Sequence, residues 1–262
     1  MAEAGTAEFD DKGWLRFGRD DDIAAWVKSA LPFARASLAD PRFSDWWRCD
    51  RSWFAGVNAL PNDASWAVPG GPPLTGEAIR FIGAHLMPPP LVWDRAQISA
   101  CFPGYPRHGA EESETAYRYR RDRDAAHVDG LARIGAERHR QLSEPHAFIL
   151  GIPLTDCAAS PLVVWEGSHR VMTEALRAAV SSRPPAEWAG ADVTEAYVTA
   201  RRRVFTTCRR VPVRARPGEA YLIHRLALHG ILPWEDGIAA GPEGRMIAYF
   251  RPLLAGFADW LA

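Results

Sequence analysis

Residues 216–230, RPGEAYLIHRLALHG, carry the pattern that decides the fold. The opening Arg-Pro-Gly-Glu is typical of a turn, and the short apolar run 220–223 that follows contains aromatic and β-branched residues. A run of this kind between turn residues favours a strand over a helix. A second strand-like run ends at His229, directly before Gly230. The stretch therefore predicts two strands that carry two histidines, His224 and His229.

Further short apolar runs of the same kind lie on both sides of this stretch. Each is bounded by turn residues and is too short to suit a helix. The predicted strands are 97–102, 147–153, 161–165, 211–214, 220–223 and 246–251.

Helical patterns dominate the first part of the chain. Residues 20–39 begin with acidic side chains, which suit the positive end of a helix dipole, and place apolar residues on one face. Pro32 lies inside this pattern, so we expect it to kink or split the helix. Shorter helices are expected at 76–85, 173–180 and 185–201. Helices first and strands later predict an α+β chain around a sandwich or barrel, with its flanking helices mostly N-terminal.

Length and composition fit a single domain, residues 1–262, with a loose polar stretch at 1–12. The net charge of −1 argues against nucleic acid and anionic membranes as partners, and no apolar run reaches membrane-spanning length. The four cysteines stand singly, without a CxxC pair, so a thiolate zinc site is not expected. The N-terminus has no basic start followed by a hydrophobic stretch, so we expect a cytoplasmic protein.

The segment AAHVDG, residues 125–130, contains the chemistry. In an extended chain side chains alternate, so His127 and Asp129 face the same way, and Gly130 lets the backbone turn away. His229 offers a third ligand. Two histidines and one carboxylate form the facial triad of non-haem Fe(II) oxygenases. His224 competes with His229 for the third place, because the residues alone do not separate the two.

An arginine on the last predicted strand offers a partner for a carboxylate. Arg245 begins the run RMIAYFRP, 16 residues after His229, and its planar fork suits a dicarboxylate co-substrate. Arg251 is its rival, because the even spacing places both on one side of a strand. A separate cluster, Arg118, Arg120, Arg121 and Arg123, is open to two interpretations: contact with an anionic substrate, or a solvated loop with acidic partners.

Four blocks in order resemble the phytanoyl-CoA dioxygenase-like family, whose members depend on Fe(II) and 2-oxoglutarate. The blocks are QISACFPGYP (97–106), AAHVDG (125–130), LVVWEGSHR (162–170), and RPGEAYLIHRLALHG (216–230) followed by Arg245. The resemblance covers about residues 97–252 and departs from the family pattern at Glu166 and Ile231, where proline and often serine stand in the family.

The resemblance implies a double-stranded β-helix core, which is a jelly-roll or cupin-like fold. It implies iron held by His127, Asp129 and His229, because the family ligand is the histidine before glycine. It also implies 2-oxoglutarate and O2 as co-substrates, with the far carboxylate of 2-oxoglutarate on Arg245. The expected reaction is oxidation of a small organic molecule, most simply hydroxylation, with decarboxylation of 2-oxoglutarate to succinate and CO2.

The carboxylate of Asp129 argues against halogenation, because related halogenases have a small residue at this place to admit chloride. Two other classes stay open. One is a hydrolase that uses the same ligands for another divalent metal, since histidine and aspartate also suit zinc. The other is an inactive binding or regulatory protein on the same scaffold, which the changes at Glu166 and Ile231 keep open.

Overall fold

Antiparallel strands in two facing sheets form the centre of the computed structural model, which describes residues 2–86 and 95–262. The elements are, in chain order, α1 Ala2–Lys12, β1 Trp14–Phe17, α2 Asp21–Ser37, the 3-10 helix η1 Pro41–Trp46, β2 Trp47–Arg48, β3 Trp53–Gly56, α3 Glu77–His85, β4 Gln97–Cys101, α4 Glu114–Asp122, β5 Leu131–Ile134, β6 His139–Leu142, β7 Phe148–Pro153, β8 Leu162–Trp165, α5 Ser168–Val180, η2 Pro185–Glu187, α6 Thr194–Thr207, β9 Arg210–Val213, β10 Ala220–His224, β11 His229–Ile231, β12 Arg245–Phe250 and α7 Phe257–Trp260. The predicted α+β class is confirmed, and each of the six predicted strands agrees with an observed one to within one residue at either end.

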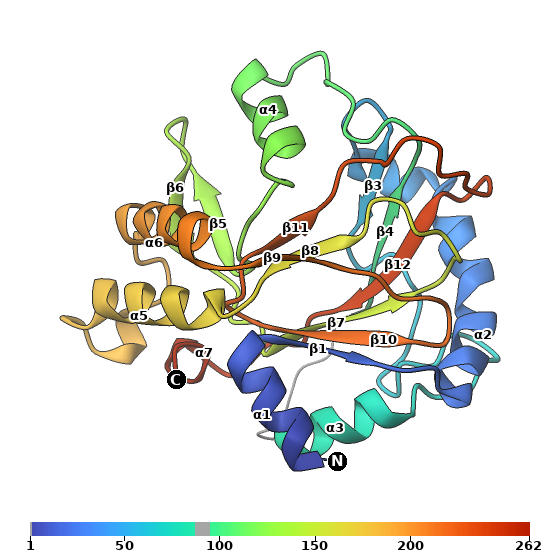
Figure 1. Ribbon diagram of the computed structural model, residues 1–262, viewed down its shortest axis with the longest axis horizontal. Coiled ribbons are helices and arrows are strands. Elements are labelled where there is room, and N and C mark those ends of the chain that lie inside the picture. Colours follow the sequence, from blue (N-terminus) through green and yellow to red (C-terminus); the bar gives the residue numbers. More distant parts are fainter. Residues whose placement is uncertain (1, 87–94) are drawn as a thin grey trace.

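The larger sheet has seven strands in the order β1-β10-β7-β12-β4-β3-β2, and a smaller sheet has the order β11-β8-β9. Neighbouring strands in both sheets are antiparallel. A separate hairpin pairs β5 with β6. Figure 1 shows the smaller sheet lying over the larger one, with α2 on one side of the molecule and α5 and α6 on the other.

Alternation along β12 explains how the sheets pack. Ile247 and Tyr249 belong to the buried cluster that joins the larger sheet to β8 and β9 of the smaller sheet. Phe250 points to the opposite face, where its ring lies 5.7 Å from that of Trp26 on α2. Each face of the larger sheet thus has its own apolar layer, as the period of two in a strand requires.

Gly151 on β7 lets an aromatic side chain enter the space between the sheets. A Cβ at this position would lie 2.2 Å from a ring carbon of Tyr221, so only glycine leaves room for that ring. Tyr221 then donates a hydrogen bond of 2.9 Å from its hydroxyl to that of Tyr249. The two hydroxyl groups are thus the hydrogen-bonded polar groups of an otherwise apolar layer.

Two expectations concern the N-terminal part, and the first was wrong. The stretch 1–12 was expected to be loose, whereas Ala2–Lys12 is helix α1 and Phe9 is buried in the main core. Pro32 was expected to kink or split its helix, and it does not split it, because α2 runs from Asp21 to Ser37 with Pro32 inside it. The apolar face of α2 continues on both sides of Pro32, and packing of that face compensates for the hydrogen bond that proline removes.

Smaller differences concern the other helices. The pattern at 185–201 becomes a short 3-10 turn followed by α6, which begins only at Thr194. Helix α5 begins at Ser168, ahead of the predicted start at 173, and therefore includes His169. No helix within residues 2–86 and 95–262 is both long enough and apolar enough to cross a membrane.

Candidate metal centre

The three predicted ligands lie together in the structure. His127 is not in a regular strand, but its backbone forms one antiparallel bridge with His229, through N–H to O distances of 2.8 and 3.0 Å. The bridge places the two imidazole rings side by side, with their centroids 4.5 Å apart. Asp129 Oδ1 lies 3.3 Å from His127 Nε2 and 3.8 Å from His229 Nε2. One atom of each side chain therefore points to a common centre, and all three lie within 4.8 Å of one another.

Both histidines are held in the tautomer that a metal needs. His127 Nδ1 lies 2.9 Å from the carbonyl of Ala125, and His229 Nδ1 lies 2.9 Å from the carbonyl of Ala227. A carbonyl only accepts hydrogen bonds, so each Nδ1 carries the proton and each Nε2 keeps a free lone pair. Second partners of this kind commonly orient metal-binding histidines.

The protonation states also suit a divalent cation. Burial, followed by the nearby His127, lowers the pKa of His229 to about 4, so its ring is neutral near pH 7. Burial alone would raise the pKa of Asp129, but the charge of Arg251, followed by the contact with His127, brings it well below its usual value. The site thus offers a neutral imidazole at His229 and a carboxylate at Asp129, as metal binding requires. The His127 side chain is 37 % exposed, against 12 % for Asp129, so the centre is most open beside His127.

Arg251 lies at this centre and fixes the carboxylate. Its Nη1 donates to Asp129 Oδ2 at 3.1 Å, and its Nη2 donates to Gln97 Oε1 at 2.7 Å. Since Oδ2 is engaged by Arg251, Oδ1 is the oxygen that faces the histidines. The even spacing on β12 had placed Arg251 on the correct side of the strand, but no sequence signal pointed to Gln97 or to the contact with Asp129.

Arg245 lies at the other end of β12, six positions from Arg251, and is buried between the sheets. Its Nη1 atom is buried and has no hydrogen-bond partner among the described residues. Burial alone would lower the pKa of Arg245, but Tyr249, Cys101 and Tyr221 outweigh that effect and raise it. Arg245 is therefore a fixed, incompletely paired cation on the inner surface of the larger sheet.

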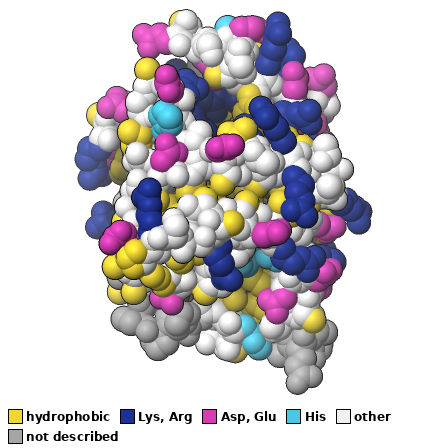
Figure 2. Space-filling model, turned by 90° about the vertical axis from the view of Figure 1, so that its left-hand side faces the viewer, with side chains coloured by type: hydrophobic (Ala, Val, Ile, Leu, Met, Phe, Trp, Pro, Cys, Tyr) yellow, Lys and Arg dark blue, Asp and Glu magenta, His cyan; other side chains and the backbone are white. Residues whose placement is uncertain are grey.

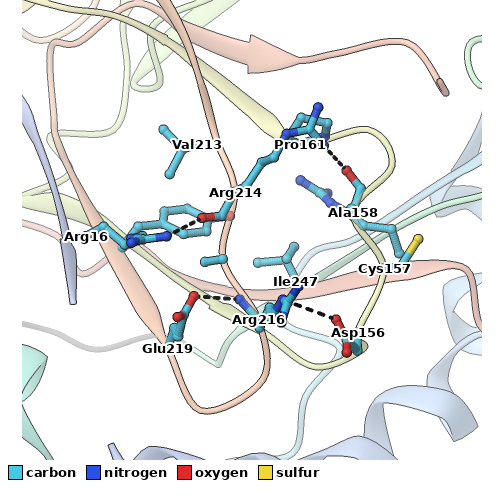
Figure 3. A pocket seen from close by; sticks show the side chains of 13 residues that line it. Arg16, Asp156, Cys157, Ala158, Pro161, Val213, Arg214, Arg216, Glu219 and Ile247 are labelled. Carbon is cyan, nitrogen blue, oxygen red and sulfur yellow. Dashed lines mark hydrogen bonds and ion pairs between the residues drawn. The ribbon is translucent and has the colours of Figure 1, made fainter. Parts of the chain in front are cut away.

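A cavity of about 410 Å³ reaches Arg245 and is shown in Figure 3. The guanidinium groups of two other arginines around it have partners: Arg216 pairs with Asp156, and Arg214 pairs with Glu235 and donates to the carbonyl of Ala158. These pairs lie around the cavity, whereas Arg245 keeps an orphaned donor. A buried guanidinium with an unused donor costs free energy, so an anionic ligand such as a carboxylate would stabilise it.

The competing histidine lies elsewhere. His224 packs against His169, with ring centroids 4.7 Å apart, and accepts a hydrogen bond at Nδ1 from the backbone N–H of Leu226. Within the part of the chain that the structure describes, His127, Asp129 and His229 form the one group of three side chains close enough to share a metal ion. The geometry therefore favours His229 over His224 as third ligand.

Comparison with known proteins shows likeness at the level of structure. No protein-family model matches the chain, and no curated protein matches it in sequence. A solved structure of the non-haem alpha ketoglutarate-dependent carbocyclase SnoK from nogalamycin biosynthesis is similar, with a TM-score of 0.55 and 15% identity over 97% of this chain and 85% of that chain. AviO1 from Streptomyces viridochromogenes Tue57 is similar with a TM-score of 0.52 and 17% identity, over 97% of this chain and 96% of AviO1. At this identity the likeness shows a shared fold.

Proposed function

We propose that the chain is a non-haem Fe(II)- and 2-oxoglutarate-dependent oxygenase with a double-stranded β-helix core, similar to the phytanoyl-CoA dioxygenase-like family. The observation that carries the proposal is the convergence of His127, Asp129 and His229, with both histidine Nδ1 atoms bonded to backbone carbonyls. The fold shared with an alpha ketoglutarate-dependent carbocyclase supports it.

The residues fit the groups that this function needs. His127, Asp129 and His229 would hold Fe(II), since two imidazoles and one carboxylate suit that ion and leave positions for other ligands. The orphaned Nη1 of Arg245 would bind the far carboxylate of 2-oxoglutarate. When bound, iron and 2-oxoglutarate supply O2 activation, with succinate and CO2 as products.

The chain itself would contribute positioning and exclusion of water. Arg251 keeps Asp129 Oδ1 directed at the metal centre. The apolar layer around Tyr221 and Tyr249 keeps the Arg245 guanidinium out of bulk water, which strengthens its attraction for a carboxylate. Asp129 occupies the place that halide binding needs, so we propose hydroxylation or another oxidation of a small organic molecule.

Anaerobic addition of Fe(II) and 2-oxoglutarate to the purified protein tests the proposal. We expect a metal-to-ligand charge-transfer band that requires both components, and succinate after admission of O2. Zn(II)-supported hydrolysis without the band would instead establish the hydrolase. Absence of both the band and succinate, in a folded protein that binds Fe(II), would establish the inactive scaffold.

A further inference from the structure

A second cavity, of about 760 Å³, lies between α4, the β5–β6 hairpin and α6. Eight arginines line it, against three acidic residues. Figure 2 views the molecule from the side of α5, α6 and the hairpin, and shows a hollow in the upper part of this face with basic side chains beside and within it. The wall of this cavity is therefore strongly positive, although the whole chain is nearly neutral.

Part of that positive charge is already compensated. Arg118 pairs with Glu114 at 2.8 Å, and Arg120 pairs with Glu112 at 2.6 Å. These belong to the cluster that the sequence singled out, and their acidic partners agree with its solvated-loop interpretation. These two salt bridges do not compensate the charge of the remaining arginines of the cavity.

Arg133, Arg140 and Arg201 come from β5, β6 and α6 and form no salt bridge with any described carboxylate. The Nε atom of Arg201 is buried and has no hydrogen-bond partner within the described residues. Arg133 lies at the exposed rim, and partial burial, followed by the charge of Arg140, lowers its pKa. Because arginine does not lose its proton in proteins, the three charges repel one another until an anion binds between them.

Aromatic rings hold two of these guanidinium groups in place. Arg201 lies 4.9 Å from the centre of the Tyr119 ring and 5.2 Å from that of Tyr197. Arg140 lies 5.3 Å from the centre of the same Tyr197 ring. A cation–π contact uses none of the N–H donors of a guanidinium group, and these donors bind oxyanions well.

Residues 125–127 connect the cavity to the metal centre. Ala125 lines the cavity, and its carbonyl is the acceptor for His127 Nδ1. The hydroxyl of Tyr119, the ring beneath Arg201, donates to the carbonyl of Ala126 at 2.7 Å. The peptide that carries the most exposed metal ligand is therefore bonded directly to the support of the arginine cluster.

We propose that Arg133, Arg140 and Arg201 bind a phosphoryl group of the substrate that the metal centre oxidises, an assignment that rests on the proposed function. Three uncompensated cations suit a doubly charged oxyanion better than a single carboxylate. The cavity is larger than a phosphate ion, and the remaining space admits the organic part of a phosphorylated small molecule.

Binding of inorganic pyrophosphate to the metal-free protein, measured by calorimetry at constant ionic strength, tests the site. Arg140→Gln and Arg201→Gln are expected to weaken binding by about tenfold or more, because each removes a charged donor. Arg202→Gln is the matched control: Arg202 is the exposed neighbour on α6 and does not line the cavity, so affinity should stay within about twofold. Arg245→Gln should also retain binding, which separates this site from the Arg245 cavity.

Two further variants guard against loss of folding. Arg133→Gln alters the exposed rim, and Arg201→Lys keeps the charge while losing the planar fork, so both should weaken binding in a protein with unchanged circular dichroism. No binding, or an equal loss in Arg202→Gln, would overturn the site. Because neither iron nor 2-oxoglutarate is present, failure of the oxygenase proposal leaves this result intact.

The substrate assignment is tested with pairs of small molecules that differ only in a phosphoryl group. Stimulated succinate release should occur with the phosphorylated member alone and fall about tenfold or more in Arg201→Gln, with the KM for 2-oxoglutarate unchanged. Stimulation by the unphosphorylated members alone, together with intact pyrophosphate binding, would overturn the assignment to substrate and not the oxygenase activity.

Discussion

Single backbone carbonyls determine much of the chemistry at the residue scale. The carbonyls of Ala125 and Ala227 each lie two residues before a histidine and fix its tautomer, so both Nε2 atoms face the same centre. Arg251 orients the carboxylate of Asp129 by donating a hydrogen bond to one of its two oxygens. The centre is thus oriented before any metal binds, which lowers the reorganisation that binding requires.

Replacing His127 by alanine is expected to abolish stoichiometric Fe(II) binding, because two ligands are too few to hold the ion. His224→Ala should leave Fe(II) affinity within a few-fold of wild type, since its ring packs against His169 away from the centre. Anaerobic Fe(II) titration of both variants, after confirming that each is folded, measures this. The reverse outcome would make His224 the third ligand.

Arg251→Gln is expected to weaken Fe(II) affinity by about 10- to 100-fold, because Asp129 loses the partner that directs its second oxygen. Arg251→Lys should recover part of that loss. Metal titration gives the affinities without any need for turnover. Unchanged affinity in Arg251→Gln would show that the contact with Asp129 does not position the ligand.

At the scale of elements, β12 positions residues of the candidate site and α1 anchors the N-terminal part of the chain. Strand β12 begins with Arg245 at the cavity and is followed directly by Arg251 at the metal centre, so one element positions residues for both places. Helix α1 packs through Phe9, and the carbonyl of Asp10 accepts a hydrogen bond from His169 Nε2 at 3.0 Å. The N-terminal helix is therefore anchored on His169 of α5, and its Phe9 ring also contacts His224 of β10.

These histidines make stability depend on pH. Burial lowers the pKa of His224 well below 6.5, and burial also lowers the pKa of His169. Below pH 6.5 these two histidines are therefore protonated in the unfolded chain but stay neutral in the folded protein. The contribution of His169 and His224 to the stability of the folded state is complete above pH 6.5. It is lost progressively as the pH falls towards their pKa values in the folded protein.

We expect the melting temperature of the metal-free protein to fall from pH 8 to pH 5, and His224→Gln to show a shallower fall over the same range. Differential scanning calorimetry at several pH values measures both slopes. His108→Gln is a suitable control, because His108 is exposed. Equal slopes in wild type and His224→Gln would contradict a neutral, buried His224.

At the scale of the whole molecule, the candidate site spans both sheets. His229 belongs to the smaller sheet and Arg245 to the larger one, so ligands bound at both places connect the two layers. A ligand at 100 times its Kd stabilises the folded state by about 2.7 kcal/mol. For a chain of this size that corresponds to a rise in melting temperature of roughly 5–10 °C.

We expect that rise when Mn(II), as a redox-stable stand-in for Fe(II), and 2-oxoglutarate are added together. Arg245→Gln should lose the part that depends on 2-oxoglutarate, with its affinity falling about 10- to 100-fold, and keep the part that depends on metal. Thermal unfolding with each component alone separates the two. A 2-oxoglutarate effect that survives in Arg245→Gln would place the carboxylate on another residue.

Local pattern predicted the strands and the candidate ligands. A short apolar run identified β12, the period of two placed Arg245 and Arg251 on one side, and the HxD spacing put His127 and Asp129 together. These inferences succeed because alternation of side chains is a property of any extended backbone. The same reasoning failed for α1, because its anchoring depends on Phe9 meeting a core built from later parts of the chain.

The sequence by itself determined the α+β class, the strand pattern and the set of residues able to bind a metal. Only the tertiary structure decided which of them meet. Arg251 contacts Asp129 across 122 positions and Gln97 across 154 positions of the chain. The arginine cavity likewise brings together α4, the β5–β6 hairpin and α6. Contacts of this range depend on how the sheets and helices pack, and a local pattern of residues carries no information about packing partners.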